Sequence, residues 1–357
     1  MSSFSLKKSV VAFVALVLLG SLTLTACNAA MSAGNPTPTL PKATATPDPK
    51  AGWPAKFVIG FFAGDNPEAI MLNNEPMRVY LEGRLGIKVE LLTGSSYSAV
   101  IEALRAKKAD AMQVGPFSYI LAVQEAGAEA LAVGITADAK NPVYNPKKLP
   151  YYYSVIITKK GSGVSTLADL KGKDFSFVDP ASTSGHLMPR ALLVKAGLNP
   201  DKDMRTIFAG SHPTSVSAVW NGKVHAGATY LGNVYNLYID KQVELCFWPD
   251  GDIAKPRTEQ EIREMYDACP EGKLVIIAMT DPIPNTPFAV RSDLPESFKA
   301  EVKAALLALK DNPEEIAKIK RWYVDPSKEL GLKNLDAFYN PLREVAKVLD
   351  LNLKAME

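Results

Sequence analysis

The most chemically informative segment of the chain is DPASTSGH, residues 179–186, which contains the hydroxyl triplet Ser182, Thr183 and Ser184. It follows a predicted strand and opens a predicted helix, where the first backbone N–H groups have no partner within the helix. Those N–H groups, the positive end of the helix dipole and the hydroxyls can together bind a compact anion. Gly185 would let the backbone approach such a ligand closely. The alternative is a helix start that is simply capped by one serine.

The elements that must position this segment alternate along the chain. Short apolar runs predict strands, and the amphipathic stretches between them predict helices, one of which Pro189 is expected to distort. Two alternating series predict two α/β domains with parallel sheets and crossover helices. Strands are expected at 57–62, 87–92, 109–114, 130–134, 152–158, 174–178, 206–209, 224–228, 274–279 and 288–290, and helices at 67–85, 99–108, 118–126, 185–196, 214–221, 233–241, 295–310, 313–322 and 335–350.

The N-terminus has the features of an export signal. Lys7 and Lys8 precede an apolar run over residues 10–24, which is shorter than the ~20 residues that a membrane-spanning helix needs. The run ends in LTAC, residues 24–27, which resembles the bacterial lipobox. The resemblance implies cleavage before Cys27 and a diacylglycerol group on its sulfur, which would tether the protein to the outer face of a membrane. An uncleaved membrane anchor is the alternative.

Residues 28–52 are rich in Pro, Thr, Ala and Ser and cannot bury a core, so we expect an extended tether there. The expected organisation is a lipoprotein signal peptide at 1–26, a tether at 27–53, a first lobe at 54–153 and 283–357, and a second lobe at 154–282 with an insertion at about 242–273.

Composition and motif content argue against several classes of function. The net charge is +2 and no long basic run follows residue 8, which gives no support to a nucleic-acid partner. The three histidines include no metal-spaced pair, and the chain has no HExxH, GxSxG or Walker sequence. We therefore expect a monomeric binding protein with no catalytic residue, cofactor or metal, and an enzyme acting on a phosphorylated substrate is the weaker alternative.

The segment VDPASTSGHLMPRALLVKAGL, residues 178–198, resembles the signature of the phosphate/phosphite/phosphonate-binding family of ABC-importer substrate-binding proteins. The resemblance implies an α/β, two-lobe periplasmic-binding-protein fold of type II. Each lobe would be a mixed sheet flanked by helices, the ligand would bind in a cleft between the lobes, and an importer permease would be the partner. The resemblance extends to the segments 97–119, 151–155 and 209–228. It covers roughly residues 55–310 and is weakest over 240–273.

The resemblance also implies roles for single residues. The hydroxyl triplet would hold the phosphoryl or phosphonyl oxygens. Tyr97 and Tyr152 would donate hydrogen bonds or line the cleft, and His212 is similar in position to a histidine that reaches the ligand in some members. Packing is the alternative for Tyr152, a helix start for Tyr97 and a loop end for His212. The candidate ligand-binding set is completed by Gly185, His186, Tyr119 and Thr286.

The chain departs from the family where an aminoalkylphosphonate would need a carboxylate beside its ammonium group. Residues 229–233, TYLGN, contain no acid, and family members often carry an aspartate where Thr286 stands. Both features favour a compact phosphorus oxyanion, which would be phosphite, phosphate or a small alkylphosphonate. Another anion such as a sulfonate, or a vitamin precursor, is the alternative, because one fold serves many ligands.

The predicted insertion contains Cys246 and Cys269. In an exported protein we expect them to form a disulfide, and two free thiols are the alternative. The bond would close a loop of about twenty-four residues and contribute ~3 kcal/mol to stability.

Overall fold

The computed structural model describes residues 50–64, 66–138 and 141–349, all within one compact unit. The predicted signal peptide, Cys27 and nearly all of the predicted tether lie outside the described residues. The described part of the chain contains no helix with the length and apolar character that a bilayer span requires.

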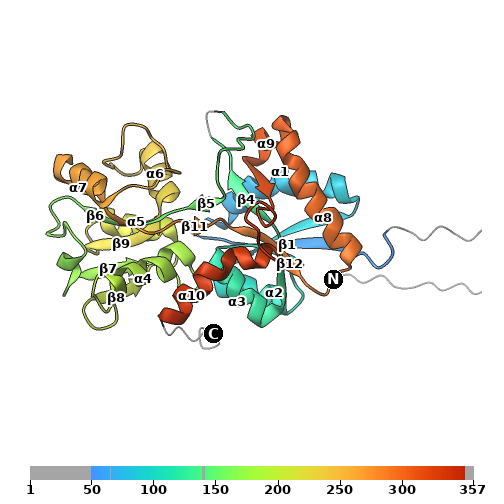
Figure 1. Ribbon diagram of the computed structural model, residues 1–357, viewed down its shortest axis with the longest axis horizontal. Coiled ribbons are helices and arrows are strands. Elements are labelled where there is room, and N and C mark those ends of the chain that lie inside the picture. Colours follow the sequence, from blue (N-terminus) through green and yellow to red (C-terminus); the bar gives the residue numbers. More distant parts are fainter. Residues whose placement is uncertain (1–49, 65, 139–140, 350–357) are drawn as a thin grey trace, which may run out of the picture. The chain divides into compact units, whose positions relative to one another are not determined.

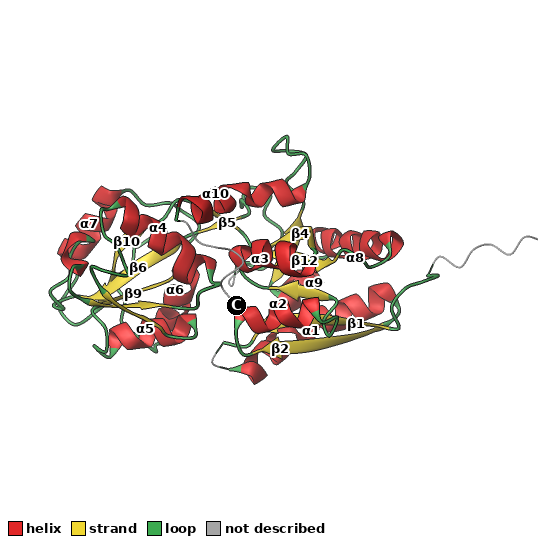
Figure 2. Cartoon of the chain, turned by 90° about the horizontal axis from the view of Figure 1, so that it is seen from below, coloured by secondary structure: helices red, strands yellow, loops and turns green. Residues whose placement is uncertain are grey.

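The first sheet has six strands and is mixed (Figures 1 and 2). β1 pairs in parallel with both β2 and β3, whereas β12 is antiparallel to both β3 and β4. The spatial order is β13 (Arg321–Val324), β4 (Ala128–Thr136), β12 (Pro287–Arg291), β3 (Ala111–Gln113), β1 (Lys56–Phe62) and β2 (Lys88–Gly94).

The second sheet has five strands and is also mixed. Its order is β10 (Leu274–Met279), β6 (Ser154–Lys159), β9 (Ala226–Tyr230), β7 (Asp174–Phe177) and β8 (Arg205–Phe208). The chain passes between the two sheets twice, through β5 (Tyr151–Tyr152) and β11 (Ile283–Pro284), which pair antiparallel (Figure 1).

Helices cover both faces of each sheet, which explains the apolar runs in the strands. Phe57 and Ile59 of β1 belong to one buried cluster and Val58 to another, as the two-residue period of a strand requires. The helices are α1 (Pro67–Leu85), α2 (Tyr97–Arg105), α3 (Pro116–Ala126), α4 (Met188–Lys195), α5 (His212–Trp220), α6 (Leu231–Ile239), α7 (Glu259–Ala268), α8 (Glu296–Ala308), α9 (Pro313–Ile319) and α10 (Asn340–Val348).

Helix ends follow local sequence signals. In α1 the Asn66 side chain accepts the backbone N–H of Ala69, Pro67 occupies the first turn, and Gly86 ends the helix with a φ of 62°. After α9, however, Lys320 adopts the left-handed conformation that glycine usually supplies, with a φ of 60°. The helix predicted at 313–322 is therefore too long, because the chain turns at Lys320 and continues as strand β13.

One further expectation needs correction. The predicted strand at 152–158 is interrupted at Tyr153, since β5 pairs with β11 while β6 belongs to the second sheet. The region 242–273 contains a helix, α7, which begins with a capping box formed by Thr258 and Glu261.

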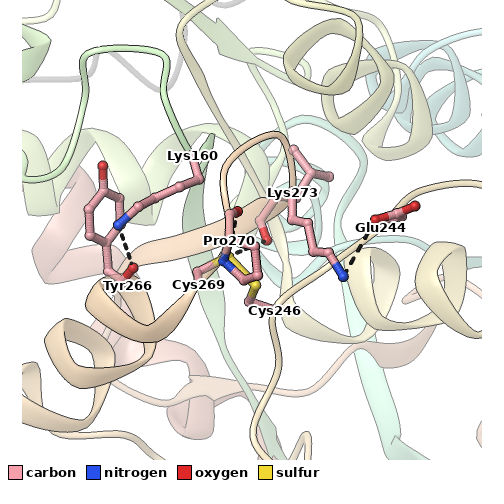
Figure 3. Close-up of a disulfide and its surroundings, with 8 residues drawn as sticks. Lys160, Glu244, Cys246, Tyr266, Cys269, Pro270 and Lys273 are labelled. Atoms are coloured by element: carbon pink, nitrogen blue, oxygen red, sulfur yellow. Dashed lines mark hydrogen bonds and ion pairs between the residues drawn. A yellow bond between two sulfur atoms is a disulfide. The ribbon is translucent and has the colours of Figure 1, made fainter.

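Cys246 and Cys269 form a disulfide in the structure (Figure 3). Beside it, the Lys160 ammonium donates a hydrogen bond to the Tyr266 carbonyl at 2.8 Å and lies over the Tyr266 ring. The disulfide joins the end of α7 to the segment around Cys246. That segment lies against the start of β10, where the Cys246 N–H donates to the Leu274 carbonyl at 2.9 Å.

Candidate ligand-binding site

The hydroxyl triplet lies on a π-helical turn, Thr183–Leu187, and not on the first turn of an α-helix. The Leu187 N–H reaches back to the Ser182 carbonyl at 3.0 Å, and α4 begins at the next residue. Pro189 has no N–H, so it cannot continue this ladder onto the Ser184 carbonyl. That carbonyl instead accepts the Ser154 hydroxyl at 2.6 Å, which fixes the turn to β6.

The three hydroxyl residues are almost fully buried and have separate partners. Ser182 Oγ accepts the Gly185 N–H at 3.0 Å and so caps its own turn. Thr183 Oγ1 accepts the Phe117 N–H at 2.8 Å, which brings the first turn of α3 against the triplet. The Ser184 side chain lies beside the Tyr152 hydroxyl.

Two of the predicted tyrosines converge on the triplet. The Tyr97 hydroxyl lies beside the Ser182 side chain, and the Tyr152 hydroxyl lies beside the side chains of Ser184 and Thr183. Burial raises the pKa of Tyr152 to about 12 and raises the pKa of Tyr97 further. Both phenols therefore stay protonated at neutral pH and can donate hydrogen bonds to an anion.

His212 lies at one side of this group, in contact with a tyrosine that the sequence analysis did not single out. Its ring meets Tyr230 edge-on with a centroid separation of 4.8 Å, and Tyr230 meets Tyr152 at 6.3 Å. His212 Nδ1 lies 3.2 Å from Thr229 Oγ1. Burial lowers the pKa of His212 to about 3, so the imidazole is neutral and its contribution would be a hydrogen bond and not a charge.

The structure places His186 and Tyr119 away from the triplet's hydroxyls. His186 Nδ1 donates to the Pro180 carbonyl at 2.8 Å, and its ring packs against Phe177 and Phe208. The Tyr119 hydroxyl donates to Asp336 at 2.7 Å within the fully buried part of α3. Both side chains are held in packing environments, although their neighbours in the sequence reach the site.

Thr286 and Gly185 also have structural contacts. The Thr286 carbonyl accepts the Gly134 N–H at 3.0 Å, which links β12 to β4. A Cβ at Gly185 would lie 2.3 Å from the Cβ of Val178. Glycine is therefore needed here for packing against the end of β7 and not for a close approach to a ligand.

Residues outside the predicted ligand-binding set complete the site. A Cβ at Gly115 would lie 3.1 Å from Thr183 Oγ1, so glycine permits the approach of α3. Ser118 Oγ donates to the Ala181 carbonyl at 2.8 Å. Asp179 accepts the backbone N–H groups of Ala181, at 2.8 Å, and of Tyr97, while burial raises the pKa of its carboxyl. One sequence signal could have indicated this contact. The helix that starts at Gly115-Pro116-Phe117 has no capping side chain of its own, so its first N–H groups need an acceptor from another segment.

Within the described ranges, no cluster of His, Cys, Asp or Glu side chains could hold a metal ion. The site instead presents phenol and aliphatic hydroxyls, backbone N–H groups and a neutral imidazole. Hydrogen-bond donors of this kind, gathered in a buried place, suit a small oxyanion. A surface hollow of about 600 Å³ between α1 and α9, lined in part by Tyr80 and Arg84, is a separate feature.

Comparison with known proteins gives three kinds of match. The family model described as "ABC transporter, phosphonate, periplasmic substrate-binding protein" matches residues 59–330. The chain is 32% identical over 198 residues to the phosphate-import protein PhnD of Mycolicibacterium smegmatis, covering 53% of this chain and 60% of that protein. It is 29% identical over 246 residues to the phosphonates-binding periplasmic protein of Escherichia coli, an alignment that covers 68% of this chain and 62% of that protein. The alignments thus span about three fifths of the length of these curated relatives.

Among solved structures, PhnD1 from Prochlorococcus marinus in complex with methylphosphonate matches with a TM-score of 0.61 at 18% identity, covering 85% of this chain and 99% of that one. At this identity the likeness shows the fold alone, which is the two-sheet α/β fold of periplasmic binding proteins.

Proposed function

Because the chain belongs to the family of phosphonate periplasmic substrate-binding proteins of ABC transporters, we propose that it captures a small phosphorus oxyanion for an importer. The ligand is phosphite, phosphate or a small alkylphosphonate. A family of extracytoplasmic binding proteins performs recognition and not catalysis. The names of the two curated relatives, a phosphate-import protein and a phosphonates-binding protein, support this class of ligand.

The observation that carries the proposal is the convergence of two tyrosine hydroxyls on the hydroxyl triplet. Tyr97 reaches Ser182, and Tyr152 reaches Ser184 and Thr183. A phosphoryl or phosphonyl group offers three strong acceptor oxygens, so it can accept charge-assisted hydrogen bonds from these hydroxyls, which are stronger than bonds between neutral groups.

Capture requires the two sheets to move relative to each other. We infer a first lobe from 54–153 and 283–357 and a second lobe from 154–282, with the crossing strands β5 and β11 as the hinge. A ligand held by the triplet of one lobe and by Tyr97 of the other contacts both only when the lobes are closed. Such differential contacts shift the population to the closed state, which a permease then recognises.

We also propose that the protein is a lipoprotein, anchored through diacylglycerol on Cys27 to the outer face of the bacterial membrane. Support comes from the lipobox-like LTAC at residues 24–27, directly after an apolar run. Replacement of Cys27 by serine should move the protein from the membrane fraction to the soluble fraction and abolish incorporation of labelled palmitate. Unchanged labelling in this variant would rule out the anchor at Cys27.

Calorimetric titration of the purified protein tests the ligand class. The series is phosphite, phosphate, methylphosphonate, 2-aminoethylphosphonate and sulfate. We expect tight binding of at least one of the first three, and weakening by at least about tenfold in Ser184→Ala, which removes a charge-assisted hydrogen bond. Binding of sulfate alone would show that the protein recognises a sulfur oxyanion instead. If none of the five compounds binds, the proposed ligand class is refuted.

A further inference from the structure

Arg321 stands at the edge of the first sheet that faces the site. β3 and β4 point the same way, because both are antiparallel to β12. β3 leads directly to Gly115, which approaches Thr183, and β4 continues along the same edge to Thr136. Arg321 is the partner of Thr136 in the β13–β4 register, so it lies at this same edge.

The Arg321 guanidinium has no counter-ion within the part of the chain that the structure describes. Arg321 is half-buried, and among the described residues it forms no ion pair and no side-chain hydrogen bond. Other half-buried or buried arginines of the chain are paired: Arg291 with Asp110, Arg257 with Asp250 and Arg78 with Glu75. A partly desolvated guanidinium without a partner is costly to keep, because its donors can be satisfied only by water or a ligand.

Tyr230 connects Arg321 to the predicted ligand residues. The positive charge of Arg321 acts on the Tyr230 phenol and opposes the effect of burial on its pKa. The same tyrosine ring contacts both His212 and Tyr152. Its hydroxyl, like the guanidinium, has no hydrogen-bond partner among the described residues. Two donors that lack an acceptor among the described residues therefore lie close to each other, beside His212 and Tyr152.

No carboxylate of the site can satisfy Arg321. Residues 229–233, at the end of β9, contain no acid. Asp179, the buried acid near the triplet, is already occupied by the backbone N–H groups of Ala181 and Tyr97. The side of the site that a ligand's substituent would reach is thus cationic and rich in donors.

Building on the proposed function, we propose that Arg321 and Tyr230 form a subsite for a second anionic group, so that the preferred ligand is a small phosphonate whose substituent carries a carboxylate. The phosphonyl oxygens occupy the hydroxyl triplet, Tyr97 and Tyr152. The carboxylate accepts hydrogen bonds from the Arg321 guanidinium and the Tyr230 hydroxyl. A cationic substituent at the same place would meet a like charge and would be disfavoured.

The test is calorimetric titration of the purified protein with methylphosphonate, isobutylphosphonate, phosphonoacetate and 2-aminoethylphosphonate. Isobutylphosphonate has an uncharged isobutyl group in place of the carboxymethyl group of phosphonoacetate, so the pair separates the charge of the substituent from its shape. We expect phosphonoacetate to bind at least about tenfold more tightly than isobutylphosphonate, as one charge-assisted hydrogen bond provides. In Arg321→Gln this advantage should disappear, while methylphosphonate affinity stays within about twofold of wild type.

Control variants make the result specific. Arg321→Lys should keep part of the preference, since it retains the charge but not the planar fork. Arg263→Gln, which removes a surface arginine of α7 paired with Asp267, should leave all affinities unchanged. If the wild type binds methylphosphonate but does not prefer phosphonoacetate over isobutylphosphonate, the subsite is refuted while the proposed function stands. If none of the four phosphonates binds and phosphite and phosphate are also silent, the proposed function itself fails.

Discussion

The side-chain oxygen of Thr183 accepts the backbone N–H of Phe117 at 2.8 Å, so a residue of the π-helical turn caps a helix that lies 66 positions earlier in the chain. Helix α3 needs this cap, because its own N-cap residue is Gly115 and offers no side-chain hydrogen bond. Ser118 Oγ, which donates to the Ala181 carbonyl, strengthens the same junction. The predicted ligand residue Thr183 thus also holds the two halves of the site together.

Replacing Thr183 by valine should therefore affect stability and binding together. The variant keeps the shape of the side chain but leaves the Phe117 N–H without its acceptor, which we expect to cost about 1 kcal/mol of unfolding free energy in urea. The affinity of the Thr183→Val variant should also fall for the phosphorus oxyanion that the wild type binds most tightly. Thr183→Ser, which retains the oxygen, is the control and should stay near wild type. An equal loss in both variants would show that the methyl group, and not the hydrogen bond, is what matters.

Gly185→Ala should destabilise the protein strongly. The added methyl group would lie 2.3 Å from the Cβ of Val178, so either β7 or the π-helical turn must move, at a cost of about 2 kcal/mol or more. The matched control is Gly83→Ala in α1, where nothing lies within 4 Å of the added Cβ. That change should stabilise the helix by about 0.5–1 kcal/mol. Thermal unfolding of the two variants measures the contrast, and similar melting temperatures would contradict it.

Stability should fall as the pH drops from 7 to 5. Burial lowers the pKa of His212 to about 3 and of His186 to about 4, both below the ordinary value near 6.5. Below pH 6.5 the unfolded chain binds protons at these positions while the folded protein does not, so the unfolded state is favoured progressively. Each histidine should lower the unfolding free energy by up to about 2 kcal/mol between pH 7 and pH 5.

Urea unfolding at several pH values checks this prediction. His212→Gln and His186→Gln should each show a shallower dependence of unfolding free energy on pH than the wild type. The matched control is His225→Gln, at a half-exposed histidine beside Asp174. An unchanged slope in both test variants would mean that the buried imidazoles do not control the acid sensitivity.

Reduction of the Cys246–Cys269 disulfide should weaken the fold without removing binding. The two cysteines are 23 positions apart, and opening a loop of this length costs about 3 kcal/mol through the entropy of the unfolded chain. The bond lies beside α7 and β10, so the hydroxyl triplet should keep its geometry (Figure 3). Unfolding with and without reductant measures the loss, and the double variant Cys246→Ala/Cys269→Ala should be insensitive to reductant. A loss of ligand affinity on reduction would instead connect this region to the site.

Local sequence was sufficient where neighbouring residues decide the structure. The hydroxyl triplet followed by Gly185 marked the start of a helical turn, which the structure makes π-helical, and the apolar runs at β1 and β10 are typical of strands with both faces covered. Boundaries were less predictable. Lys320 adopts a conformation normally taken by glycine, and strand β13 exists only because it pairs with β4, which is almost two hundred positions earlier.

By itself, the sequence determined the alternation of strands and helices and the family, and it predicted an export-type N-terminus and a hydroxyl triplet that binds an oxyanion. The tertiary structure decided which candidates meet at the site. It brought Tyr97, Tyr152 and His212 together with Tyr230, but turned His186 and Tyr119 into packing environments. It also placed Arg321 at the same edge. The physical reason is that these contacts join residues from separate strands, and the direction of a side chain depends on strand register and helix packing, which neighbouring residues alone do not specify.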